Sequence, residues 1–156
     1  MTLSIPEEAS LYGFTLNGLG SHSSRTMMLS ELRMLLASCG SNADVEGYRS
    51  AIIHENALLK NTDSTRRKSF RHLRELYALD RGTILFSALR DLWDEDEESQ
   101  PLLAVLCAVA RDPSFRATTP VILQARESSV VTSEMMAEAV KEYYPGRLKA
   151  STLAKI

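Results

Sequence analysis

Hydrophobic residues recur at the spacing of helical turns along most of this chain, separated by short polar stretches. The recurrence predicts six helices, over about 24–39, 45–57, 63–80, 83–93, 101–110 and 132–143. Two short helices are expected to begin at Pro113 and Pro120, because each proline follows a residue suited to cap a helix. Leu102–Ala110 is apolar nearly all round and is expected at the centre of the core. We predict an all-α fold, a compact multi-helix domain.

Interruptions of this pattern divide the chain into three parts. Residues 1–22 form a leader, residues 23–93 an N-terminal module and residues 99–156 a C-terminal helical module. We interpret the acidic run Asp94–Glu98 as a solvated connection, because five consecutive carboxylates splay apart and do not converge on a cation. A last helix is expected from about Lys149 and meets the chain end without a stop signal. The C-terminal module is therefore expected to be truncated.

The third predicted helix is basic, although the protein is mildly acidic. Its apolar residues recur as one stripe, at Phe70, Leu73, Leu76 and Tyr77. Arginines form a second stripe beside it, at Arg67, Arg71 and Arg74. Three helices with short turns and a basic third helix follow the order of a helix-turn-helix unit, whose last helix enters the major groove. Plain helical bundles have the same order, so both interpretations stay open.

The first turn of the basic helix favours an anion. Thr62, Asp63 or Ser64 can cap it, and the free N–H groups of the turn lie beside several cations. Phosphate is the obvious ligand for such a turn. A charged stripe is also typical of an ordinary solvated helix face, and Arg71 with Glu75 is a common surface pair.

Composition limits the possible functions. The 156 residues have a formal charge of −2, so any binding of nucleic acid must come from a local patch. The N-terminus does not resemble a secretion signal, and no apolar run is long enough to cross a membrane. A cytoplasmic location is therefore expected. Cys39 and Cys107 lack a CxxC partner and are expected to be buried free thiols.

No motif in the sequence predicts an enzyme or a cofactor. His54-Glu55 begins like a zincin helix, but Leu58 stands at the position that the second histidine would need. The glycines fall singly and form no phosphate-binding or dinucleotide-binding loop. A metal-dependent nuclease would need converging carboxylates and histidines, which the sequence does not offer, so an enzyme is the least favoured class.

Four stretches of the sequence resemble the BrxA family of bacteriophage exclusion (BREX) defence systems. They are Arg25–Glu31, Lys60-x-Thr62 with Arg66, Leu76–Asp80 and Leu102–Pro113. The resemblance covers about residues 24–156, and Leu-Cys-Ala-x-Ala-Arg-Asp-Pro is its most specific block. It implies a mostly helical fold with winged helix-turn-helix modules, binding of double-stranded DNA and no catalytic activity. The chain would hold one complete helix-turn-helix and the start of a second, winged one.

The resemblance also assigns site residues. Together with Lys60 from the basic stretch, the predicted nucleic-acid-binding residues of the first module are Lys60, Thr62, Ser64, Thr65, Arg66, Arg67, Lys68 and Arg71. Those of the second module are Arg147, Lys149, Ser151 and Thr152. The expected partners are duplex DNA and other BREX components.

Two alternatives to a DNA-binding protein remain. The family has been likened to a helical RNA-binding antitermination factor, which keeps an RNA ligand open. A protein–protein adaptor within the defence complex would instead use a surface at Met27 and Met28, or the acidic run.

Overall fold

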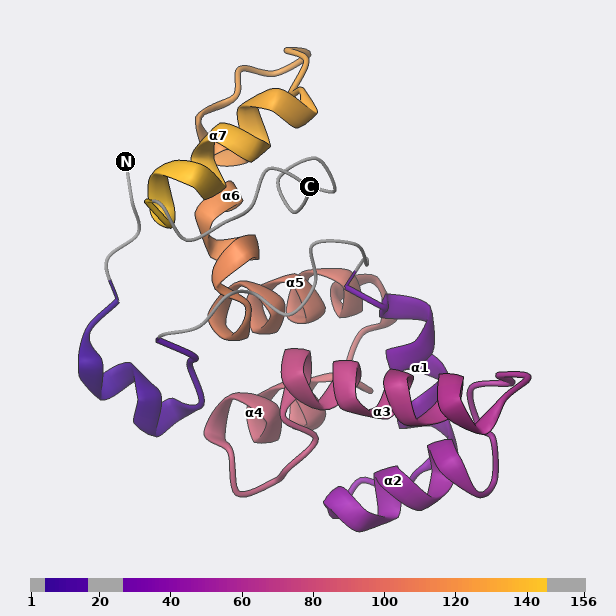
Figure 1. Cartoon of the computed structure of the whole chain (residues 1–156). Coiled ribbons are helices and arrows are strands. Elements are labelled where there is room, and N and C mark those ends of the chain that lie inside the picture. Colours follow the sequence, from indigo (N-terminus) through magenta and orange to yellow (C-terminus); the bar gives the residue numbers. More distant parts are fainter. Residues whose placement is uncertain (1–4, 17–26, 146–156) are drawn as a thin grey trace.

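The computed structural model describes residues 5–16 and 27–145, and it confirms the all-α fold over these residues (Figure 1). Its α-helices are α1 Leu29–Ser38, α2 Val45–Ile53, α3 Asp63–Tyr77, α4 Ile84–Leu92, α5 Gln100–Arg111, α6 Pro113–Gln124 and α7 Ser133–Tyr143. Two short 3-10 helices, η1 Glu7–Tyr12 and η2 Glu97–Ser99, precede α1 and α5. No described helix is both long and apolar enough to cross a membrane.

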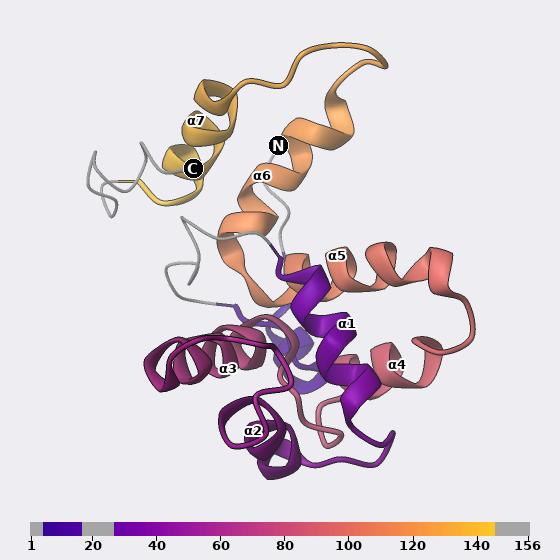
Figure 2. The same ribbon diagram turned by 90° about the vertical axis from the view of Figure 1, so that its right-hand side faces the viewer.

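The helices form two regions, which we call the body and the hairpin. The body consists of α1 to α5, and the hairpin consists of α6 and α7, which pack on each other. In both views the hairpin stands away from the body and joins it at the end of α5 (Figures 1 and 2). Because α5 packs against α3 and α4, the core of the predicted N-terminal module extends past residue 93 to include α5.

α3 forms as the sequence predicts. Leu73, Leu76 and Tyr77 are fully buried and Phe70 is half-buried against the same core, so the apolar stripe is the buried face of the helix. The Thr62 side chain caps the first turn by accepting a hydrogen bond from an N–H group of that turn. α3 is therefore fixed along its length by the body core.

The connection from α2 to α3 is longer than predicted. α2 ends at Ile53 rather than near residue 57, and residues 54–62 form the connection, whereas a helix-turn-helix turn has about three to four residues. Asn56 and Leu59 adopt left-handed backbone angles there, with φ of 57° and 53°, and Leu58 is buried between them. The order of three helices is present, and its assignment as a helix-turn-helix unit stays a prediction.

α5 is buried on one face only, so its expected place at the centre of the core was wrong. Ala104, Cys107 and Ala108 face the body core, whereas Leu102 and Leu106 are 62% and 56% exposed. Small side chains on the inner face let α5 approach α3 and α4 closely. A stretch that is apolar all round does not tell which of its faces the neighbouring helices will cover.

One continuous helix replaces the two short helices predicted after residue 112. α6 begins at Pro113 with Asp112 as its cap, and Pro120 lies inside it. Thr119 does not cap a new helix, because its hydroxyl donates a hydrogen bond of 2.8 Å back to the Phe115 carbonyl. Pro120 has no N–H to donate to the carbonyl four residues earlier, that of Arg116, and α6 continues past this missing bond.

The two cysteines are both free, as predicted. Cys107 is buried, whereas Cys39 is only half-buried where α1 ends. The described part of the leader packs on the body: η1 contacts α4, and the Thr15 N–H donates to the Ala110 carbonyl at 3.1 Å.

Candidate nucleic-acid interface

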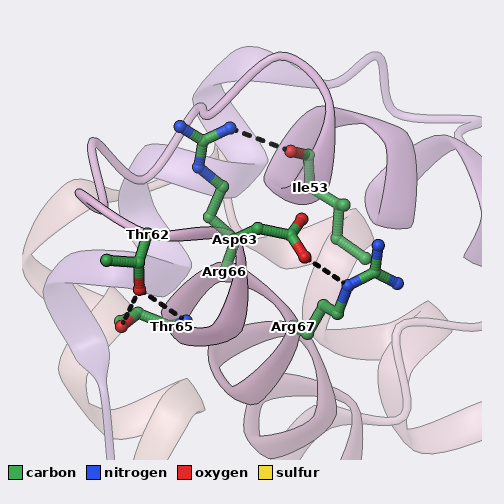
Figure 3. Close-up of polar contacts among 6 residues, drawn as sticks. All are labelled: Ile53, Thr62, Asp63, Thr65, Arg66 and Arg67. Carbon is green, nitrogen blue, oxygen red and sulfur yellow. Dashed lines mark hydrogen bonds and ion pairs between the residues drawn. The ribbon is translucent and has the colours of Figure 1, made fainter.

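The first turn of α3 is less open to anions than the sequence predicts. Thr62 Oγ1 accepts a hydrogen bond of 3.2 Å from the Thr65 N–H and lies 2.8 Å from the Thr65 hydroxyl (Figure 3). Asp63 is exposed in the same turn and pairs with Arg67 at 2.6 Å. The Thr62 cap and the negative charge of Asp63 already complement the positive end of the helix, so an additional anion gains less there.

Two of the predicted cations hold the fold together. Arg66 donates a hydrogen bond of 3.2 Å to the Ile53 carbonyl and thereby ties α3 to the C-terminal end of α2 (Figure 3). A second bond of 3.2 Å goes from Arg66 to the Lys60 carbonyl. Lys60 pairs with Glu31 of α1 at 3.0 Å, with both side chains largely shielded from solvent. A cation at the end of α2 complements the dipole of that helix. Arg66 and Lys60 therefore stabilise the packing of α3 and its preceding connection against α2 and α1.

The remaining cations of α3 form an exposed basic face, which we define as Arg67, Lys68, Arg71 and Arg74. The side chains of Arg67 and Arg71 are 56% and 63% exposed. Arg71 lies 4.0 Å from Glu75, and Lys68 has no ion pair within the described residues. Exposed ion pairs contribute at most about 1 kcal/mol, so a phosphate group can replace the carboxylate of either pair.

The spacing of this face follows helical geometry. Arg67, Arg71 and Arg74 are separated by four and three residues, so they form one row that extends about 10 Å along the helix axis. Lys68 lies one position farther round. Ser64, which the sequence also predicts as a site residue, is exposed on the first turn.

A further arginine, Arg111, reaches the end of α3 from α5. It donates hydrogen bonds of 2.9 Å to the Glu75 carbonyl and 2.7 Å to the Gly13 carbonyl, and a longer one of 3.5 Å to Arg74. Burial lowers the pKa of Arg111, and the like charge of Arg74 lowers this pKa further. The sequence places Arg111 in the most specific block of the family resemblance, but nothing in that block showed that it meets α3.

A hollow of about 380 Å³ lies where α3 and α5 meet, and we call it the α3–α5 hollow. It is lined by Phe70, Arg71, Arg74, Glu75 and Arg111. A larger hollow of about 550 Å³ lies between α6 and α7, where Glu138 and Glu142 contribute to its lining. Carboxylates repel anions, so the α3–α5 hollow is the better suited of the two to phosphate.

The predicted residues of the second module, Arg147, Lys149, Ser151 and Thr152, lie outside the described residues. Within the described ranges, no group of three or more His, Cys, Asp or Glu side chains could hold a metal ion. The candidate site residues that the structure describes are cations and hydroxyl side chains of the body.

Comparison with known proteins identified no relative of this chain. A scan against protein-family models, a search of curated proteins and a search of solved structures each found no match to this chain. The interpretation of the site rests on its geometry and charge, together with the motif resemblance described above.

Proposed function

We propose that this protein binds duplex DNA through the exposed basic face of α3, as a non-enzymatic component of a BREX phage-defence system. The observation that carries the DNA-binding proposal is the exposed row of Arg67, Arg71 and Arg74 beside the apolar face of α3, which is buried in the core. The motif resemblance to the BrxA family is what supports the role in phage defence.

The basic face would act mainly on the phosphate backbone. Four cations within a few helical turns neutralise phosphates and release counterions, a contribution that does not depend on base sequence. We expect weak binding with little sequence preference and a steep loss of affinity as salt increases. Arg66 and Lys60 contribute through the fold rather than by contact, because their side chains are engaged with α2 and α1.

The testing experiment is a fluorescence-anisotropy titration of a short DNA duplex at about 50 and 200 mM salt. Arg67→Ala with Arg71→Ala should weaken binding and lower the salt slope by up to about 2, since each phosphate contact contributes about 0.9. The matched control replaces Arg49 and Lys141 with Ala. The side chains of Arg49 and Lys141 are 38% and 60% exposed, and each pairs with a glutamate on its own helix, α2 or α7.

The outcomes separate the candidates. A double variant that binds like the parent, at an unchanged melting temperature, would contradict contact through α3. Equal losses in the variant and its control would indicate a general charge effect instead. A parallel titration with duplex RNA tests the RNA alternative, which would require tighter binding to RNA than to DNA.

A protein adaptor is the second candidate, and one observation favours it. Leu102 and Leu106 on α5 leave an apolar face uncovered by described residues, and exposed apolar patches often mark interaction sites. Of the two methionines predicted at a partner surface, Met28 is buried in the core and Met27 is half-buried against it. An adaptor acting through α5 would keep its partner at high salt.

A further inference from the structure

The α3–α5 hollow brings together three guanidinium groups from two helices. Arg71 and Arg74 lie on adjacent turns of α3, and Arg111 comes from the last turn of α5. Its volume of about 380 Å³ is in the range of small-molecule sites. Among the described lining residues Glu75 is the single carboxylate beside three arginines, so positive charge dominates this part of the hollow.

Arg111 is held in place by neutral groups. Its three hydrogen bonds in the described structure go to the main-chain carbonyls of Glu75, Gly13 and Arg74. Within the described residues no carboxylate pairs with it. A guanidinium carries five N–H donors, so two remain after these bonds. Arg111 therefore provides a fixed, partly desolvated positive charge whose compensation by a negative group is incomplete.

The neighbouring charges make the hollow favourable for an anion. Arg74 and Arg111 carry like charges in the same lining. Burial lowers the pKa of Arg111, Cys107 raises it, and the like charge of Arg74 lowers it by a smaller amount. Glu75, a carboxylate of the lining, lies 3.2 Å from His72 Nδ1 and 4.0 Å from Arg71. An anion between Arg74 and Arg111 would offset the repulsion between the two guanidinium groups. It would also accept hydrogen bonds from the two remaining N–H donors of Arg111.

We propose that the α3–α5 hollow is a phosphate-binding site formed by Arg71, Arg74 and Arg111. Planar guanidinium groups match the oxygens of a phosphate group in paired hydrogen bonds. The half-buried Phe70 ring adds apolar surface, which suits a sugar attached to the phosphate better than a second charge. The phosphate belongs either to a nucleic-acid backbone, in which case the site rests on the proposed function, or to a free phosphate ester.

The test follows the arginine Nε–H signals of the whole protein by NMR during three titrations. The probes are inorganic phosphate, adenosine monophosphate and a short DNA duplex, each compared with sodium chloride at equal ionic strength. Saturable shifts are expected at Arg74 and Arg111 and not at Arg49, which lies on α2 and pairs with Glu46 at 2.7 Å. Arg74→Gln should weaken binding of the small phosphates about tenfold. Arg49→Gln should leave it unchanged.

Each outcome decides the proposal. Shifts with phosphate or adenosine monophosphate support the site, and shifts with the duplex alone support it with the nucleic-acid backbone as the source. If the small phosphates bind and the duplex does not, the site stands and the DNA-binding function fails. If the duplex shifts Arg67 while Arg74 and Arg111 stay still in all three titrations, the site is overturned and the function stands. Arg111→Lys keeps the positive charge but loses the planar guanidinium group. If this variant binds phosphate more weakly, its melting temperature shows whether the protein is still folded.

Discussion

The body and the hairpin contain a similar kind of helix but differ greatly in how much core holds them. Among the described residues, twenty buried apolar residues form one cluster in the body, whereas the cluster of the hairpin contains three, Ala117, Val140 and Tyr144. The hairpin depends instead on Arg116, a fully buried arginine. Its guanidinium donates to the carbonyls of Val109 at 3.2 Å and Thr15 at 2.9 Å. Apolar burial stabilises the body, and a buried polar anchor attaches the hairpin to it.

This difference explains why the candidate site belongs to the body. α3 presents its cations on one side and buries Leu73, Leu76 and Tyr77 on the other, so the charged row keeps its spacing. A surface on the hairpin would move whenever its few contacts open, since regions with little buried apolar area open at low free energy. Substitutions at the exposed face of α3 should therefore report on binding rather than on folding.

Leu76→Ala should produce the largest effect, because the residue is fully buried where α3 meets the body core. We expect the free energy of unfolding to fall by about 2–5 kcal/mol, from lost burial and the cavity left behind. Urea denaturation measures it. The control is Leu123→Ala on the exposed side of α6, which should change stability by less than about 0.5 kcal/mol. Similar losses in the two variants would contradict the burial of Leu76 as the source of its contribution to stability.

Cys107 tests how tightly the body core is sealed. Burial raises the pKa of its thiol from 9.0 to about 12, so the unfolded chain ionises first as pH rises. The stabilising contribution is complete below about pH 9 and is lost between about pH 9 and 12, at up to about 1.4 kcal/mol per pH unit. Urea denaturation at about pH 8 and about pH 10.5 should show a smaller loss of stability at the higher pH for Cys107→Ala than for the parent. Equal losses would indicate that water reaches the thiol.

Val140→Ala addresses the hairpin. Val140 is the fully buried aliphatic residue of its small cluster, and losing two methyl groups should cost about 1–3 kcal/mol. We expect the loss to be local: hydrogen exchange of α6 and α7 amides should accelerate while α3 amides keep their protection. Val130→Ala, at an exposed position between α6 and α7, is the matched control and should change neither rate. Faster exchange in α3 would show that the two regions open together.

Local patterns allowed α3 to be predicted closely. Its apolar and charged residues alternate with the period of a helix, so the pattern predicts which face of α3 is buried. Thr62 caps its first turn. For α5 the prediction was wrong, because a uniformly apolar stretch has no periodicity that selects Ala104 over Leu102 as the inner side. Which face is covered depends on helices distant in sequence.

The roles of the individual cations depended on contacts that no local pattern contains. Lys60 and Arg66 have the same charge as Arg67, and only the positions of Glu31 and the Ile53 carbonyl distinguish them. Arg111 meets the end of α3 across 36 residues of sequence. A spacing argument treats every cation of a basic stretch alike, whereas the fold divides them into anchors and exposed groups.

The two helix caps provide the smallest and most closely matched comparison. Thr62 Oγ1 accepts from the Thr65 N–H at 3.2 Å in the body, and Thr132 Oγ1 accepts from the Met135 N–H at 3.3 Å in the hairpin. Replacing either threonine with Ala removes one such bond and should cost its own helix about 0.5–2 kcal/mol.

The same chemical change should appear differently in the two regions. α3 unfolds only with the body, so Thr62→Ala should lower the urea midpoint of the whole protein. α7 is held by few apolar contacts, so Thr132→Ala should accelerate exchange of α7 amides and leave that midpoint within error of the parent. Equal shifts of the midpoint would mean that body and hairpin unfold as one cooperative unit. In that case the buried Arg116 anchor couples them more strongly than the size of their cores suggests.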